Sequence, residues 1–245
     1  MSDIGDVLKL KENTLSDCAK YIKAISEISS AITSEECVED ALELIVRKTA
    51  EAARFETCSF WLVDESVNPP KIRLKASHIM DRISMKDRCL DMNEGVIGSV
   101  ISTGRYRLIR NIYMEPLITG NELERESGLA SMVSVPLQTN GGSVLGVFNC
   151  FTARPHDFTE TEFRMITAMA NYAVMMILNM ELAHRAEKLT EEIETRKQVE
   201  KAKDILMRKR NINGEDAFRW IQKRSMNSRR SMREVAESVI LSEEL

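Results

Sequence analysis

The stretch from Thr159 to Arg210 contains no glycine and no proline, the two residues that most readily end a helix. At its start, Thr159 and Glu162 have the spacing of a capping box, in which a hydroxyl and a carboxylate accept from each other's backbone N–H groups. Apolar side chains then recur at helical spacing, at Phe163, Ile166, Met169, Ala170, Ala173, Val174 and Ile177. This pattern predicts one long helix whose first part packs against a folded domain.

Beyond Ile177 the apolar residues change to a seven-residue spacing. Met175, Leu182 and Leu189 occupy one seam position of this repeat, and Asn179, Ala186 and Ile193 occupy the other. Such a repeat is typical of a parallel coiled coil, and a polar residue at the seam favours a dimer in fixed register at some cost in stability. We therefore expect residues 179–195 to form the coiled-coil linker of a homodimer.

The charges of the chain are divided unevenly along it. Residues 196–233 contain thirteen basic and four acidic residues, an excess of nine positive charges. The remainder must then carry −13 to give the formal net charge of −4. An acidic body with a basic C-terminal module indicates a polyanion as the partner of that module alone.

The composition is that of a globular protein, with 43% apolar and 29% charged residues in a chain of 245. No apolar run approaches the roughly 18 residues that a membrane-spanning helix needs, and the N-terminus lacks the basic start of a signal peptide. We therefore expect a cytoplasmic protein without a membrane contact.

The five cysteines are scattered, at Cys18, Cys37, Cys58, Cys89 and Cys150. None lies in a CxxC or CxxCH pattern, which argues against a disulfide framework, a zinc site and c-type haem attachment. We expect no metal site, and we expect most of these thiols to be buried.

The region before the long helix begins with helical patterns. Residues 1–14 are expected to form a flexible N-terminus, and apolar residues at 15, 18, 22, 25, 28 and 32 predict a first helix with a narrow apolar stripe. Thr33 and Glu36 have capping-box spacing and predict a second helix over 35–53.

Extended patterns follow these helices. TCSFWLVDES (57–66) and KIRLKAS (71–77) are rich in β-branched and aromatic residues and are separated by prolines, so they predict adjacent antiparallel strands. SMVSVPLQTNGGSVLGVFNCF (131–151) predicts a hairpin that turns at its two glycines. Between these pairs, NEGVIGSVISTGRYRLIRNI (93–112) predicts a short helix and a brief strand.

The succession GVIGSVISTGRYRLIRNI, SMVSVPL, GSVLGVFNCF and RPHDFTETEFRMITAMANYAVMMI resembles a GAF domain in order and spacing, over residues 15–178. This resemblance implies an α+β fold with a central antiparallel sheet. Terminal helices that commonly form dimer bundles would cover one side, and a ligand pocket would lie on the other. GAF domains bind many different ligands or none, so the cofactor stays unknown.

The GAF-like region lacks the motifs of common catalytic centres, such as a serine elbow, a Walker-type loop or HExxH. Cys89 lies in a polar stretch that would roof a pocket, and His78 ends a strand. These two are the candidate pocket residues, against an ordinary structural or surface role for each. We expect no catalytic residue, and therefore a protein that is not an enzyme.

The C-terminal region has the pattern of two further helices. Asn211 to Gly214 predict the end of the long helix, and Asn213 is the expected cap of the next. Ser231 and Glu234 have capping-box spacing and precede apolar residues at 232, 235, 236, 239 and 240. With the end of the long helix, these predict three helices around one small core.

Residues 190–245 resemble an ANTAR domain, the RNA-binding output module of transcription antiterminators. The resemblance rests on EKAKDILMRKRNINGEDAFRWIQKRSM and RRSMREVAESVI, and it departs at Asp204 and Ser225, where the family usually has a small residue and an alanine. It implies binding to two adjacent stem-loops in nascent RNA, which keeps a competing terminator hairpin from forming.

Basic residues flank the apolar stripe of the first ANTAR-like helix, where they either contact phosphates or only solvate the helix. Trp220 lies beside Lys223 and Arg224, and it either stacks on an unpaired base or packs at the rim of the core. Arg229 and Arg230 precede a helix N-terminus, which suits phosphate oxygens. The expected RNA-binding residues are Lys197, Lys201, Ala202, Lys203, Arg208, Arg210, Trp220, Arg224, Arg229 and Arg230.

Together these patterns predict a signal-responsive antitermination regulator. A GAF-like sensor with a small molecule as its candidate ligand would dimerise through terminal helices and a coiled coil, and would control a three-helix ANTAR-like bundle. Two other classes stay open. One is a DNA-binding regulator, because three short basic helices resemble a helix-turn-helix. The other is a redox enzyme that reduces methionine sulfoxide in the GAF pocket, with the tail as a localising arm.

Overall fold

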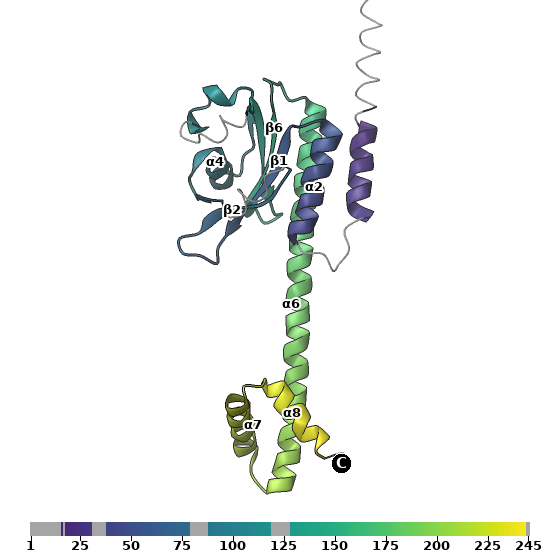
Figure 1. Ribbon diagram of the computed structural model, residues 1–245, viewed down its shortest axis with the longest axis vertical. Helices are drawn as coiled ribbons and strands as arrows, with labels where there is room; N and C mark the ends of the chain where they lie inside the picture. Colours follow the sequence, from purple (N-terminus) through teal and green to yellow (C-terminus); the bar gives the residue numbers. More distant parts are fainter. Residues whose placement is uncertain (1–15, 17, 31–37, 79–87, 119–127, 244–245) are drawn as a thin grey trace, which may run out of the picture. The chain divides into compact units, whose positions relative to one another are not determined.

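The computed structural model describes residues 16, 18–30, 38–78, 88–118 and 128–243. Two compact units divide the chain, Met1–Met180 and Glu181–Leu245, and Figure 1 colours them along the sequence. The predicted flexible N-terminus, the capping box at Thr33 and Glu36, and Cys37 lie outside the described residues.

The first unit is built on one antiparallel sheet. Its strands are β1 (Thr57–Asp64), β2 (Lys71–Ser77), β3 (Cys89–Asp91), β4 (Arg107–Ile109), β5 (Ser131–Gln138) and β6 (Val144–Thr152). They lie in the order β3-β2-β1-β6-β5-β4. Both predicted strand pairs are confirmed, since β1 pairs with β2 and β5 pairs with β6. The short strand β3 was not predicted.

Helices cover one face of this sheet. They are α2 (Val38–Ala53) and the first part of α6 (Glu160–Arg210), which lie side by side against the strands in Figure 1. Phe60 of β1 and Phe148 of β6 stack there with ring centroids 4.2 Å apart. The predicted apolar stripe of the long helix is confirmed, because Ile166 and Met169 are fully buried in the same core.

The predicted stripe of the first helix is only partly right. Residues 18–30 are helical, and the side chains they bury are Tyr21, Ala24 and Ile28. Ile22, which the spacing placed in the stripe, is 69% exposed. The buried positions follow each other at i, i+3 and i+7, so the apolar face is rotated from the predicted one.

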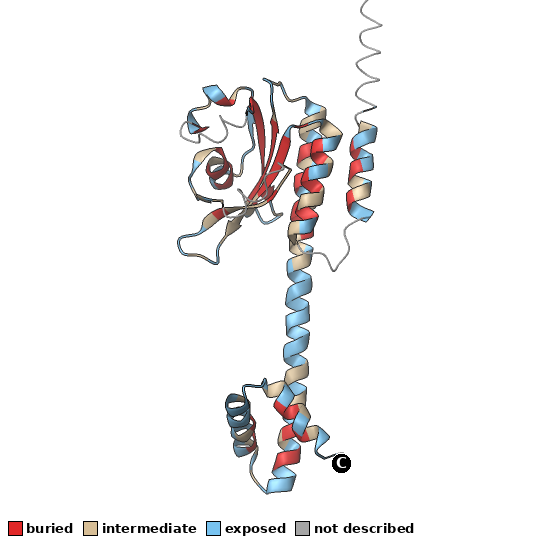
Figure 2. Ribbon diagram, in the orientation of Figure 1, coloured by how far each residue is buried: buried red, intermediate tan, exposed pale blue. Residues whose placement is uncertain are grey.

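The other face of the sheet carries α4 (Gly95–Thr103). Ile97 and Val100 of this helix pack with Val147 and Phe151 of β6 in a second core cluster. Gly98 allows the close approach of the helix to the loop before it, since a Cβ there would lie 2.6 Å from the carbonyl carbon of Asn93. Figure 2 shows both cores as buried segments on the two sides of the sheet.

The second unit is a bundle of three helices. They are the last part of α6, α7 (Gly214–Ser228) and α8 (Met232–Leu241). Its core contains Val199, Ala202, Ile205, Leu206, Ala217, Ile221, Val235, Ala236 and Val239. The predicted α+β fold class and the three-helix C-terminal bundle are therefore confirmed.

One 18-residue window of α6 has a mean hydropathy of 1.3, which meets a length and composition test for a membrane-spanning helix. The first part of the same helix buries Met165, Ile166 and Met169 in the core of the first unit. Core helices of folded domains pass the same test, so one such helix is weak evidence for a membrane span.

Candidate nucleic-acid interface

The last part of α6 exposes cations along both edges of its buried stripe. Toward α7, Lys203 lies beside Gly214, and the guanidinium of Arg210 lies over the ring of Trp220. Toward the end of α8, Nη2 of Arg208 lies 3.3 Å from Oε1 of Glu243. Lys197 and Lys201 are also exposed. The predicted arrangement, a buried stripe between two basic edges, is present.

Ala202 does not belong to this surface. Its exposure is 0%, and it packs in the core of the bundle between Val199 and Leu206. The side chain has no access to a bound nucleic acid in this conformation. Its small size instead allows α6 to approach the other two helices closely.

Lys203 is held by a neighbouring carboxylate. Its Nζ lies 3.0 and 2.9 Å from the two carboxylate oxygens of Glu200, one turn earlier on α6. The Lys203 side chain is only 20% exposed. A phosphate that approaches this ammonium has to compete with Glu200.

Trp220 was expected either to stack on an unpaired base or to pack at the rim of the core, and its surroundings agree in part with both. The ring is half-buried and packs against the core of the bundle, while Arg210 lies 4.6 Å above its centroid. A guanidinium over an indole ring is an attractive arrangement. The exposed Arg224 follows one turn later on the same helix, and Trp220 joins the core to Arg210.

The turn between α7 and α8 presents two more arginines. Arg229 has a φ of 53° and ends α7 in the left-handed region. The backbone N–H of Arg230 donates to the carbonyl of Ser225 (3.3 Å), and the Ser225 hydroxyl donates back to the carbonyl of Arg230 (2.6 Å). Ser225, one of the departures from the ANTAR pattern, therefore fixes this turn. Both arginines are exposed and outside the ion pairs of the described residues.

Helix α8 begins with the predicted capping box. The Ser231 hydroxyl accepts from the backbone N–H of Glu234 (3.2 Å), and the Glu234 carboxylate accepts from the backbone N–H of Ser231 (2.7 Å). That backbone N–H, followed by the Ser231 hydroxyl, lowers the pKa of Glu234 from 4.5. The box occupies the backbone N–H groups of Ser231 and Glu234 and leaves those of Met232 and Arg233, at the first two positions of α8, outside it.

This capping box predicts an acid-sensitive step. A carboxyl whose pKa is lower in the folded state stabilises the fold above its unfolded pKa, and this stabilisation is lost as the pH falls through the folded value. We expect the thermal unfolding temperature of the C-terminal unit to decrease as the pH is lowered from about 5 to about 3. This is roughly the range in which a carboxyl with a lowered pKa becomes protonated. Glu234→Gln should reduce this fall, whereas the exposed control Glu187→Gln should not. Equal pH profiles for both variants would contradict the role of the box.

The candidate pocket residues of the first unit are not brought into a described cavity. His78 follows β2, where its backbone N–H donates to the carbonyl of Cys58 (3.0 Å). Cys89 begins the edge strand β3 and is exposed. Within the described ranges, no group of three or more His, Cys, Asp or Glu residues is arranged to hold a metal ion.

The expectation that most thiols are buried holds for two of the four described cysteines. Cys58 and Cys150 are buried opposite each other on β1 and β6, and burial raises the pKa of the Cys150 thiol. Cys18 is half-buried and Cys89 is exposed.

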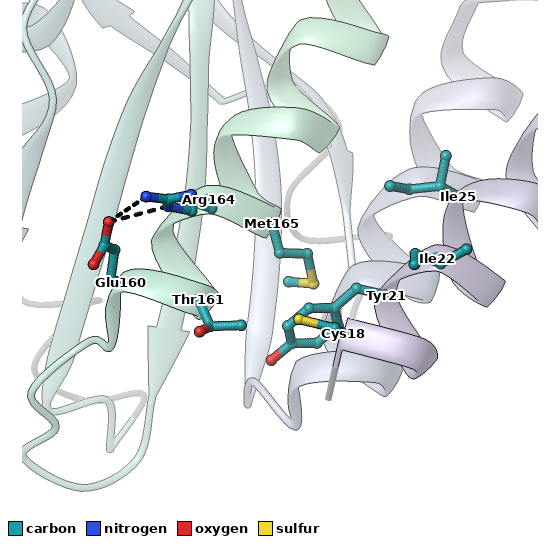
Figure 3. Close-up of a pocket in the computed structure, with 8 residues that line it drawn as sticks. All are labelled: Cys18, Tyr21, Ile22, Ile25, Glu160, Thr161, Arg164 and Met165. Carbon is teal, nitrogen blue, oxygen red and sulfur yellow. Dashed lines mark hydrogen bonds and ion pairs between the residues drawn. The ribbon is translucent and has the colours of Figure 1, made fainter. Parts of the chain in front are cut away.

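Among the described residues, each unit has a groove that is open to solvent. The groove of the first unit has a volume of about 390 Å³ and lies between the helix of residues 18–30 and the start of α6. Figure 3 shows Ile22, Ile25 and Met165 lining it, with the ion pair of Arg164 and Glu160 at one side. The groove of the second unit, about 470 Å³, is lined by Phe218, Met232 and residues 188–200 of α6.

Apolar side chains of the predicted seam are exposed on α6. Met175, Leu182, Leu189 and Ile193 are each between 57% and 62% exposed, and the middle of the helix is exposed in Figure 2. Large aliphatic side chains repeated at one helix face in this way are costly to leave in water. The helix therefore has an exposed apolar face, which is what one helix of a coiled coil has in the absence of its partner.

Comparisons with known families cover most of the chain. A family model described as a GAF domain matches residues 31–177, and a model described as an ANTAR domain matches residues 187–240. A stretch of 52 residues of the chain is 48% identical to the transcriptional regulatory protein PdtaR of Mycobacterium tuberculosis. That match covers 21% of this chain and only 25% of the relative.

Solved structures with the same fold include GAF domains. The GAF domain of a phosphoenolpyruvate-protein phosphotransferase from Coxiella burnetii aligns with a TM-score of 0.61 and 20% identity, over 71% of this chain and 99% of that one. The corresponding domain from Acinetobacter gives 0.57 and 21%, over 67% and 94%. Free methionine-R-sulfoxide reductase from Neisseria meningitidis gives 0.56 and 18%, over 66% and 91%. At these identities the likeness shows the fold alone.

Proposed function

Because the chain belongs to the GAF domain family and carries a C-terminal ANTAR domain, we propose that it is a transcription antitermination regulator. The C-terminal unit binds paired RNA stem-loops, and the GAF unit controls that binding. The observation that carries the proposal is the match of an ANTAR-domain model to residues 187–240, the basic three-helix unit.

The surface of the C-terminal unit supports RNA as the partner. Lys203, Arg210 and Arg224 lie on the α7 side, Arg208 lies on the α8 side, and Arg230 lies at the turn. Cations spaced along the edges of a small bundle suit the phosphates of a folded RNA, which is recognised by shape and backbone. The half-exposed Trp220 supplies a ring for an unpaired loop base.

The exposed seam of α6 supports a dimer. Pairing of two chains through Leu182, Leu189 and Ile193 removes apolar surface from water and places one RNA-binding unit on each chain. In such a dimer, each of the two C-terminal units binds one of two adjacent stem-loops. Binding of the first stem-loop raises the effective concentration of the second, so the overall affinity increases. Residues 179–195 are the linker in this proposal.

The architecture favours regulation over catalysis. The redox alternative required a reactive cysteine in a pocket, and Cys89 is exposed on an edge strand instead. The likeness to a methionine-R-sulfoxide reductase is one of fold, and one fold hosts many activities.

Binding and transcription assays test the proposal. We expect the purified full chain to bind a labelled RNA with two adjacent stem-loops more tightly than a DNA duplex of the same sequence. In single-round transcription, it should raise read-through at a terminator placed after those stem-loops. Preference for the duplex would support the DNA-binding alternative, and read-through without RNA binding would contradict the mechanism.

Glu200 gives a sharper test of the RNA-binding surface. Glu200→Gln removes the negative charge that competes with phosphate for Lys203, so RNA affinity should rise by about two- to fivefold, the range of a surface ion pair. The control is Glu215→Gln, which frees Arg219, a residue outside the expected RNA-binding set. Filter binding at several salt concentrations measures both. If the two variants gain the same RNA affinity, the effect comes from the net charge and not from the release of Lys203.

A further inference from the structure

Helix α6 is exposed on every side over residues 181–193. Leu182, Leu189 and Ile193 are each between 57% and 62% exposed there, and Figure 2 shows this part of the helix as exposed to solvent. A second copy of the helix can cover these side chains. The charged residues that flank the apolar face then determine how the second copy is aligned with the first.

The seven-residue repeat assigns a position to each of these flanking residues. Leu189 lies at position d and Ile193 at position a, because four residues separate a d from the next a. Arg196 is at the following d. Glu192, just before Ile193, is therefore at g, and Lys197, just after Arg196, is at e. The g and e positions flank the seam of a coiled coil and carry the ion pairs between its helices.

A parallel dimer in register brings these two charges together. In this arrangement, g of one helix faces e of the partner, five residues further along the chain. Glu192 of each chain then faces Lys197 of the second copy, so the symmetry of the dimer forms the pair twice. The preceding g position, Arg185, faces the uncharged Thr190. The exposed stretch thus gains two attractive pairs and no like-charge contact at these positions.

Both side chains are available for this contact on the single chain. Glu192 and Lys197 are exposed, and Glu192 lies outside the ion pairs of the described residues. The ammonium of Lys197 lies 4.0 Å from Oε2 of Glu194, which is the outer limit of an ion pair. By contrast, Arg185 is already paired with Glu181, one turn earlier on the same helix.

An antiparallel dimer would give Glu192 a different partner. The g positions of the two helices face each other there, so with Leu182 against Ile193 of the second copy, Glu192 would face Arg185. Arg185 already has a carboxylate partner on its own helix, whereas Lys197 has only the long contact described above. The availability of the two cations therefore favours the parallel pair.

We propose that Glu192 and Lys197 form the ion pair that aligns two copies of α6 in a parallel dimer in register. The inference rests on the dimer of the proposed function, and it assigns the residues that fix the orientation of that dimer. Lys197, which the sequence placed among the RNA-binding residues, instead faces the second copy. A parallel alignment also places both C-terminal units at the same end of the coiled coil, where they can bind adjacent stem-loops together.

Exchange of charges in the full chain tests the pair. The homodimer of Glu192→Lys has four lysines beside its seam, and that of Lys197→Glu has four glutamates, so each variant should dimerise about tenfold more weakly than the parent. A mixture of the two variants restores both attractive pairs in the heterodimer. Native mass spectrometry, with one variant labelled with heavy nitrogen, should find the heterodimer well above about half of all dimers, the fraction expected from random pairing.

The matched control is a mixture of Glu192→Lys with Arg185→Glu, which exchanges the same charges. In the parallel dimer position 185 faces Thr190, so this mixture should pair at random. Enrichment of the heterodimer in the control mixture alone would indicate the antiparallel pair and overturn the proposal. Equal results for the two mixtures would also overturn it, because net charge or chance would then explain the pairing.

The mass of the parent separates this inference from the proposed function. A parent that is dimeric, but whose variants pair at random, would retain the proposed dimer and exclude the ion pair of Glu192 with Lys197. A parent that is monomeric in the same measurement would overturn both the dimer and the ion pair. Binding of the parent to a single stem-loop, measured separately, tests RNA recognition without the dimer.

Discussion

Replacing Lys203 and Arg230 together by alanine should lower the affinity for the two-stem-loop RNA by about 10- to 100-fold at low salt. Each phosphate contact contributes close to one unit to the slope of log K against log salt concentration. We therefore expect that slope to become shallower by about one to two units. Circular dichroism should show unchanged helix content, because neither side chain lies in the core of the bundle.

The two residues are chosen because they lie at separate parts of the surface. Lys203 lies beside the start of α7, and Arg230 lies at the turn before α8. The matched control is Lys23→Ala with Arg164→Ala, two exposed cations of the GAF unit, which changes the net charge equally. A salt slope as steep as that of the parent would remove Lys203 and Arg230 from the interface.

Replacing Leu189 by lysine should prevent the proposed dimer from forming and leave a monomer. Leu189 is 59% exposed on the single chain, and in a parallel seam it meets its own copy. Two lysines placed there repel each other and remove an apolar contact. Light scattering after size exclusion measures the mass. Affinity for a pair of stem-loops should fall by about 100-fold or more as linked binding is lost, whereas affinity for one stem-loop should stay as it is.

His184→Lys is the control for this experiment. His184 is exposed and lies two residues after Leu182, on the outer side of the heptad, so the lysine is added away from the predicted seam. If the Leu189→Lys variant still forms the dimer, the predicted seam is not the dimer interface. The apolar groove between residues 18–30 and α6 would then become the surface to test by substitution of Ile22, which is exposed at its edge.

Local patterns predicted the framework of both units. Capping boxes at Thr159 and Ser231 and the stripe through Ile166 and Met169 each depend on residues within a few positions, so they can be found in the sequence. The buried face of residues 18–30 was predicted only in part, because the adjacent residues Tyr21 and Ile22 are both apolar and only one of them can face the core. Contacts with distant elements decide which of them is covered.

The candidate RNA surface was predicted in outline for the same reason. Helical spacing alone places Lys203 and Arg210 on one edge of α6 and Arg208 on the other. The Glu200–Lys203 pair has i,i+3 spacing and was open to prediction. The contact of Arg210 with Trp220 is between α6 and α7, on either side of a turn. It could not be predicted from the residue spacing within one helix.

The pairing of Asn149 with Ser59 was beyond sequence reasoning. Asn149 is the single polar residue in the apolar run VLGVFNCF, where the sequence predicts a buried strand. Its position opposite Ser59 depends on strand register across more than 80 residues of chain. Only the assembled sheet brings them together.

The unbroken helix α6, from Glu160 to Arg210, constrains how this architecture can evolve. A helix without a hinge transmits rotation, so each residue inserted or deleted between the two domains turns everything after it by about 100°. Seven residues restore the phase almost completely, whereas three or four do not. Exchange of one sensor for another by recombination should therefore succeed mainly at junctions whose lengths differ by multiples of seven.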